Sequence, residues 1–204
     1  MKVTLSIQKI AILSIVIFLT QCMPASNNNN TAKTDSTAVP DYHGYASREQ
    51  WGEHLVTVGA CNDCHTPKKM TPMGPVIDSS LLLSGHPADL PIPDVDRKDL
   101  EKKGYVVTQT LTAWIGPWGV SYTGNLTSDA TGIGNWEESN FMTAIRHGKL
   151  KGIESGRSLL PPMPWEMYRN FTDDELKAIF AFLKSTKPIH NVVPPPQPPV
   201  TAMK

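Results

Sequence analysis

The chain has 204 residues with 19 basic and 19 acidic side chains, so its formal net charge is zero. This length supports one compact domain with extensions, and the balanced charge argues against a nucleic-acid-binding surface. Eighteen prolines and a low aromatic content predict that much of the chain forms loops.

Residues 1–22 are typical of a secretion signal. Lys2 and Lys9 precede the apolar run "IAILSIVIFLT", whose length of about 11 residues falls short of the roughly 20 that a bilayer span needs. The run leads to Cys22 in "FLTQC", which resembles a bacterial lipoprotein signal whose cysteine becomes lipidated. Gln21 departs from the usual small residue there, so ordinary cleavage nearby and an uncleaved anchor stay open. All three readings predict an exported, periplasm-facing protein, and the first adds a membrane anchor at Cys22.

Two segments outside the domain have compositions that disfavour a packed core. Residues 23–43 include four consecutive asparagines and few bulky apolar side chains, so we expect a flexible linker. Residues 191–204 contain "PPPQPPV", which predicts an extended proline-rich tail. Such a tail is either inert or a partner-binding strip, and composition favours the inert one.

The domain between them, residues 44–190, is predicted to contain three helices. Their ranges are 47–58, 137–148 and 172–185, and capping boxes at Ser47 and Thr172 begin the first and third. Apolar residues recur at helical spacing on each: Trp51, Leu55 and Val58; Phe141, Met142 and Ile145; Leu176, Ile179, Phe180 and Leu183.

Residues 66–134 show little periodicity and many prolines and glycines, although "YVVTQTL" (105–111) predicts a short strand. A loop of that length is uncommon in a compact domain unless something else organises it. Three modest helices also make a small core. Both features predict a large apolar cofactor inside an all-α domain with long irregular loops.

The motif "CNDCH" places Cys61, Cys64 and His65 in the order CxxCH. A structural zinc site usually takes four ligands from two cysteine pairs, and the sequence has no second CxxC. A thioredoxin-like redox pair is expected near a βαβ pattern, which is not visible. The remaining interpretation is haem c, covalently attached through both thiols and ligated by His65. Zinc or a disulfide stays a minor alternative.

The sixth position of the haem iron needs a ligand from elsewhere or stays open. The methionines after the motif are Met70, Met73, Met142, Met163, Met167 and Met203. Met163 stands in "LLPPMPW", where flanking prolines restrict the backbone, so it is the preferred candidate and Met167 is the second. His86 and His147 are weaker candidates, because a lone histidine more often has a surface or helix-end role.

Several segments resemble one family in the order in which they occur. They are "CNDCHTP", "LLSGHP", "NLTSDATGIGNWEESNF", "RHGK", "LLPPMPWEMYRNFTDDELKAIFAFLKS" and "KPIHNVVPPP". This order is similar to class I-like c-type cytochrome domains, above all the cytochrome c subunits of membrane-bound alcohol and sugar dehydrogenases and related lipoprotein cytochromes. The resemblance covers most of residues 50–195 and implies a cytochrome c-like fold with His65 and Met163 as axial ligands. Those subunits typically carry several haem motifs, whereas this chain has one.

The expected function is therefore that of a single-haem electron carrier and not of a catalyst. It would pass one electron at a time between periplasmic or membrane redox proteins, such as a dehydrogenase and a terminal oxidase or reductase. The alternative is a haem enzyme or sensor whose sixth ligand site is open or labile. A non-haem metal-binding lipoprotein is a minor third possibility.

Overall fold

The computed structural model describes residues 41–200. The predicted signal segment with Cys22, nearly all of the predicted linker and residues 201–204 lie outside this range. Among the described residues, no helix is both long and apolar enough to span a membrane.

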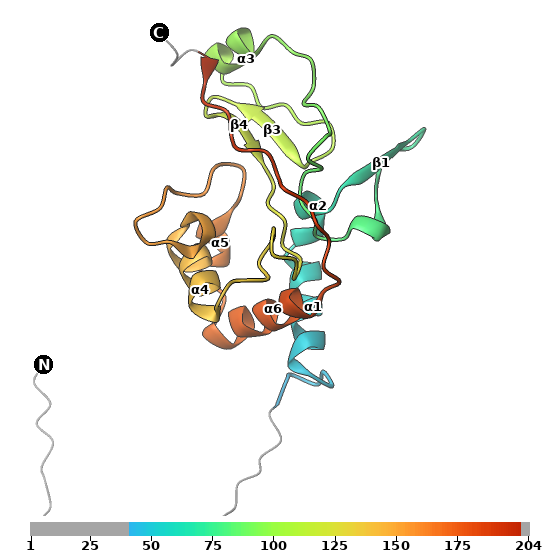
Figure 1. Ribbon diagram of the computed structural model, residues 1–204, viewed down its shortest axis with the longest axis vertical. Helices are drawn as coiled ribbons and strands as arrows, with labels where there is room; N and C mark the ends of the chain where they lie inside the picture. The colour runs from blue at the N-terminus through green and yellow to red at the C-terminus, as the bar shows by residue number, and fades with distance from the viewer. Residues whose placement is uncertain (1–40, 201–204) are drawn as a thin grey trace, which may run out of the picture. The chain divides into compact units, whose positions relative to one another are not determined.

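Residues 41–200 form six α-helices and two small antiparallel sheets (Figure 1). The helices are α1 Arg48–Val58, α2 Cys61–His65, α3 Arg97–Lys103, α4 Glu138–His147, α5 Trp165–Tyr168 and α6 Asp173–Ser185. Two 3₁₀ turns span Ser79–Leu81 and Leu150–Gly152. Strand β1 Lys68–Thr71 pairs with β2 Gly74–Ile77, and β3 Ala113–Gly116 pairs with β4 Gly119–Tyr122.

The prediction of an all-α domain is correct for the three long helices and wrong for residues 66–134. Residues 105–111, predicted as a strand, make only an isolated bridge from Val107 to Ile115. All four strands lie within residues 66–134, and in β3 and β4 Ile115 and Val120 are fully buried. Their short, glycine-flanked segments lack the length that makes alternation visible in a sequence.

The predicted helix starts are confirmed, but the predicted capping box at Ser47 is only half formed, because the Gln50 side chain accepts from the Ala46 N–H and not from the Ser47 N–H. The Ser47 hydroxyl accepts a hydrogen bond from the Gln50 backbone N–H at 3.2 Å. At α6 the Thr172 side chain accepts from the Glu175 N–H, and the Glu175 carboxylate accepts from the Thr172 N–H. Each bond satisfies one backbone donor that the helix itself leaves unpaired.

The hydrophobic core lies where α1, α4 and α6 meet (Figure 1). The buried face of α1 contains Val56 in place of Val58, which is 62% exposed. The prediction for Val58 was wrong because α1 ends there and the chain turns away at Gly59. The large buried side chains are Trp51, Leu55, Leu83, Ile133, Phe141, Ile145, Leu176, Ile179 and Leu183.

Residues 191–200, predicted as the beginning of a tail, contact the domain. Gln197 and Val120 exchange two backbone hydrogen bonds of 2.9 and 3.0 Å. The Arg97 guanidinium donates to the Pro198 carbonyl at 2.8 Å. In Figure 1 this last segment runs alongside β4 and reaches α3.

Candidate haem-binding site

The CxxCH motif forms helix α2 by itself. Ala60, in the left-handed backbone region with φ 56°, separates α2 from α1. Cys61 and Cys64 stand three residues apart on α2, which places them on the same side of the helix. Both cysteines are half-buried and neither is in a disulfide.

The environment of the two thiols differs from that of a reactive pair. Burial raises the pKa of Cys61 to about 11, and burial also raises the pKa of Cys64. A redox-reactive cysteine instead needs a stabilised thiolate. No cluster of three or more His, Cys, Asp or Glu side chains suited to a metal ion occurs in residues 41–200.

His65 is oriented by a backbone carbonyl. Its Nδ1 lies 2.7 Å from the Gly124 oxygen, and because a carbonyl oxygen only accepts, Nδ1 carries the proton. Burial lowers the pKa of His65, which favours the neutral ring. In this tautomer the lone pair lies on Nε2, as metal-ligating histidines require.

Lys68 stabilises the end of α2. Its ammonium group donates to the carbonyls of Asp63 at 2.8 Å, Asn62 at 3.4 Å and Thr66. Carbonyls at a helix C-terminus lack partners within the helix, so this cation both satisfies them and opposes the negative end of the helix dipole.

The candidate methionines differ in how far their side chains are exposed to solvent. Met163 is half-buried and packs against the hydrophobic core, as Cys61 does. Met167, the second candidate, is 72% exposed, and Met70 and Met73 are also exposed. Met142 packs against the core from α4, which agrees with a role as core filler. Met203 lies outside the described residues.

Two hydrogen bonds connect the Met163 segment to the region of the CxxCH motif. The Tyr168 hydroxyl donates to the Gly59 carbonyl at 2.6 Å, which ties α5 to the turn before Cys61. The Ser121 hydroxyl donates to the Pro161 carbonyl at 2.6 Å. Ser121 precedes Gly124, the partner of His65, by three residues. These bonds tie α5 to the turn before Cys61, and the Pro161 carbonyl to β4.

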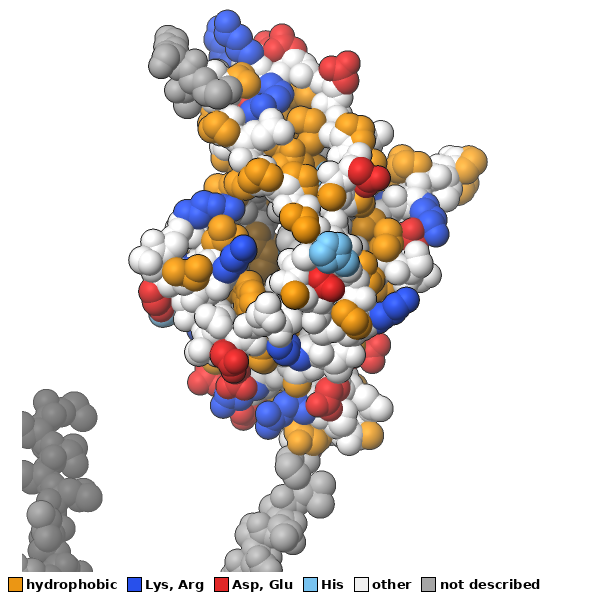
Figure 2. All heavy atoms as spheres, in the orientation of Figure 1, with side chains coloured by type: hydrophobic (Ala, Val, Ile, Leu, Met, Phe, Trp, Pro, Cys, Tyr) orange, Lys and Arg blue, Asp and Glu red, His pale blue; other side chains and the backbone are white. Residues whose placement is uncertain are grey.

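This region contains open space beside Met163. A cavity of about 210 Å³ is lined by Leu159, Pro161, Pro162, Met163, Pro164, Trp165 and Glu166. Figure 2 shows a hollow with hydrophobic side chains at its floor, between the α4–α5 part and the rest of this face. The cysteines that form no disulfide, the oriented imidazole and the half-buried thioether are the kinds of donor group that hold a haem c.

The two candidate histidines have other partners. His86 is 1% exposed, and its ring nitrogens lie 3.0 Å from the Thr112 hydroxyl and 3.0 Å from the Leu90 carbonyl. His147 pairs with Glu154 at 3.0 Å on the surface. Both side chains are thus explained without iron.

Sequence reasoning missed Gly124, Ser121 and Tyr168, which position the site. Gly124 and Pro161 contribute backbone carbonyls, and a sequence pattern carries no sign of which carbonyl faces which side chain. Tyr168 was visible as an aromatic residue five positions after Met163, but only the fold shows that its hydroxyl reaches Gly59.

No family model matches the chain, but curated relatives do. It is 29% identical over 144 residues to the gluconate 2-dehydrogenase cytochrome c subunit of Pantoea cypripedii, covering 70% of this chain and 23% of that protein. Against the fructose dehydrogenase cytochrome subunit of Gluconobacter japonicus, identity is 26% over 189 residues, 92% of this chain and 31% of that protein.

A third relative is the cytochrome c subunit of the quinone alcohol dehydrogenase of Gluconacetobacter polyoxogenes. Identity is 35% over 83 residues, which is 40% of this chain and 16% of that protein. The chain spans less than a third of each of these three relatives. The resemblance inferred from the motifs is confirmed: the chain is similar to the cytochrome c subunits of alcohol and sugar dehydrogenases.

Proposed function

We propose that the chain is a single-haem c-type cytochrome that carries one electron at a time between a dehydrogenase and a further redox protein. The observation that carries the proposal is the state of His65, whose Nδ1 donates to Gly124 and whose Nε2 therefore bears the lone pair. The relatives' names, which describe cytochrome subunits of dehydrogenases, support a carrier and not a catalyst.

Four residues hold the haem in this proposal. Cys61 and Cys64 would bind it covalently, and His65 and Met163 would ligate its iron. When bound, a haem c supplies a one-electron couple between ferric and ferrous iron. A thioether ligand raises the reduction potential of that couple, and with both axial positions taken, no site is open to a substrate.

The test of the axial ligand is Met163→Ala, with Met167→Ala as the matched control. We expect Met163→Ala to keep its haem, because the two cysteines hold it. It should lose the weak red absorption band of ferric iron bound to thioether sulfur, bind carbon monoxide readily and fall in potential. Met167→Ala should behave as the wild type, since the Met167 side chain is mostly exposed.

Two outcomes would change the proposal. If Met167→Ala abolishes the band and Met163→Ala keeps it, Met167 is the ligand and the carrier remains. If the wild type lacks the band and binds carbon monoxide freely, the sixth position is open and the protein is a haem enzyme or sensor. Acid–acetone extraction of the wild type tests the covalent attachment directly, because haem c stays with the protein.

We also propose that the domain is exported and attached to a membrane through a lipid at Cys22, with residues 23–43 as its linker. The support is the sequence alone. Cys22→Ala should release the protein from the membrane fraction or block its maturation. Wild-type protein found wholly in the soluble periplasmic fraction would exclude the anchor.

A further inference from the structure

His65 is held at two points by loops that are distant in sequence. Its Nδ1 donates to the Gly124 carbonyl at 2.7 Å, and its own backbone carbonyl accepts from the Gly85 N–H at 2.8 Å. Gly85 and Gly124 also touch each other, since a Cβ at Gly85 would lie 2.6 Å from the Gly124 carbonyl carbon. The His86 N–H donates to the Thr123 carbonyl at 3.0 Å. The position of His65 therefore depends on both loops.

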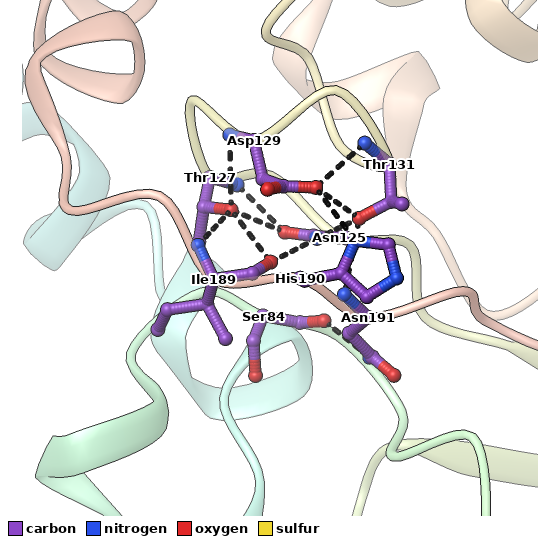
Figure 3. A network of polar contacts seen from close by, with 8 residues as sticks. All are labelled: Ser84, Asn125, Thr127, Asp129, Thr131, Ile189, His190 and Asn191. Atoms are coloured by element: carbon purple, nitrogen blue, oxygen red, sulfur yellow. Dashed lines mark hydrogen bonds and ion pairs between the residues drawn. The ribbon is translucent and has the colours of Figure 1, made fainter.

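Asn125 directly follows Gly124 and fixes the loop that contains Gly124 (Figure 3). Its side chain is 6% exposed and forms four hydrogen bonds. Oδ1 accepts from the Thr127 N–H at 2.9 Å and from the Thr127 hydroxyl at 2.8 Å. Nδ2 donates to the Thr131 hydroxyl at 3.1 Å and to the Ile189 carbonyl at 2.9 Å. These bonds use the full capacity of the amide.

Asn191 fixes the loop that contains Gly85. Its Nδ2 donates to the carbonyls of Ser84 at 2.7 Å and His86 at 2.8 Å, on either side of Gly85. Its backbone N–H donates to the Thr131 hydroxyl at 3.0 Å. The Thr131 hydroxyl thus accepts from both the Asn125 side chain and the Asn191 backbone (Figure 3), so residues 189–191 bind both loops at once.

We propose that Asn125 and Asn191 are positioning residues for His65, and that residues 189–191 complete the axial-ligand site. This inference rests on the proposed function, in which Nε2 of His65 binds iron. A histidine that donates Nδ1–H to a carbonyl is a stronger electron donor to its metal. Loss of Asn125 would release the loop around Gly124, and loss of Asn191 would release the loop around Gly85. Either change would weaken the bond from His65 Nδ1–H to the Gly124 carbonyl and leave ferric iron less stabilised.

The experiment uses the mature haem-loaded protein and the variants Asn125→Leu and Asn191→Ala. NMR of the reduced form measures exchange of the His65 Nδ1 proton with deuterium, and a redox titration measures the potential. We expect exchange to accelerate at least tenfold in both variants. We also expect the reduction equilibrium to shift at least tenfold toward ferrous iron, which is a rise of about 59 mV for one electron.

Thr131 supplies a matched pair if Asn125→Leu fails to mature. Thr131→Val removes the hydroxyl that both asparagines bind, whereas Thr131→Ser keeps it. The valine variant should show both changes, and the serine variant should match the wild type.

Thr172→Ala is the control for general destabilisation, because it removes the α6 cap without touching either loop. If Asn125→Leu or Thr131→Val lowers stability as this control does, yet keeps the wild-type exchange rate and potential, the inference is overturned. A wild-type protein without covalent haem would refute the proposed function instead, and proton exchange at His65 would still test the positioning role.

Discussion

The crossing of α1 and α6 depends on Gly52, and Gly52→Ala tests this. A Cβ at this position would lie 1.9 Å from the Ala178 carbonyl oxygen and 2.9 Å from the Phe182 Cβ. Both neighbours belong to the body of α6, so no flexible side-chain end can move aside. The helices would have to separate by roughly 1 Å or more to restore normal contact.

Two opposing effects decide the size of the change. Alanine in place of glycine favours a helix by about 1 kcal/mol. A gap of about 1 Å forfeits a quarter or more of the contact energy, and each large buried side chain contributes about 1.5–3 kcal/mol. Five such side chains line the two helices: Trp51, Leu55, Leu176, Ile179 and Leu183. The separation therefore costs about 3 kcal/mol or more, and the variant should lose about 2–4 kcal/mol.

Guanidinium unfolding followed by far-ultraviolet circular dichroism measures this loss. In a thermal melt the Tm should fall by roughly 4–16 °C, given about 2–4 °C per kcal/mol for a domain of this size. Glu53→Ala is the matched control on the exposed side of α1, and it should stay within about 0.5 kcal/mol of the wild type. A Gly52→Ala protein as stable as the wild type would refute the argument from helix contact.

Three further predictions follow from single contacts. Tyr168→Phe should lose about 0.5–1.5 kcal/mol, because the part-buried bond from the Tyr168 hydroxyl to the Gly59 carbonyl is lost; an unchanged unfolding midpoint would count against that bond. Burial lowers the pKa of His86 below its usual 6.5, so the unfolded chain binds a proton that folded His86 does not, and stability falls as pH drops below that value. His86→Gln should flatten this slope in acid titrations, and an unaltered slope would contradict it. Cys61→Ala with Cys64→Ala should give a largely disordered or molten apoprotein by circular dichroism and proteolysis, and compact apoprotein would show that the haem is not part of the core.

Sequence patterns predicted the parts of the fold that local interactions determine. The cap at Thr172 and the apolar spacing of residues 176–183 located α6 to the residue, because helix ends and faces depend on neighbours within a few positions. The contact between Gly85 and Gly124 has no such local signature, since it joins segments 39 residues apart through backbone atoms. The proposed roles of Cys61 and His65 rest on a local signature, because covalent haem attachment requires a fixed local spacing.

The contrast between local and long-range contacts indicates where the variant Cys61→Ala with Cys64→Ala should lose structure first. Residues 83–131 bury polar side chains such as Asn125, Thr127, Thr112 and His86, each hydrogen-bonded to other loop residues. A satisfied hydrogen bond contributes only about 0.5–1.5 kcal/mol net, so this half of the domain gains less from burial than the α1–α6 crossing does. Its loops also meet at His65, which a lost haem no longer holds.

Hydrogen exchange of that apoprotein should therefore show amide protection lost in residues 83–131 before it is lost in α1 and α6. The sensitive reporters are the Gly85 N–H, which donates to the His65 carbonyl, and the Leu126 N–H, which donates to the Leu83 carbonyl. Val56 and Ile179, in the apolar core, are the matched reference. Equal loss of protection at all four would mean that the loops and the helical core unfold as one unit, and that the haem stabilises both alike.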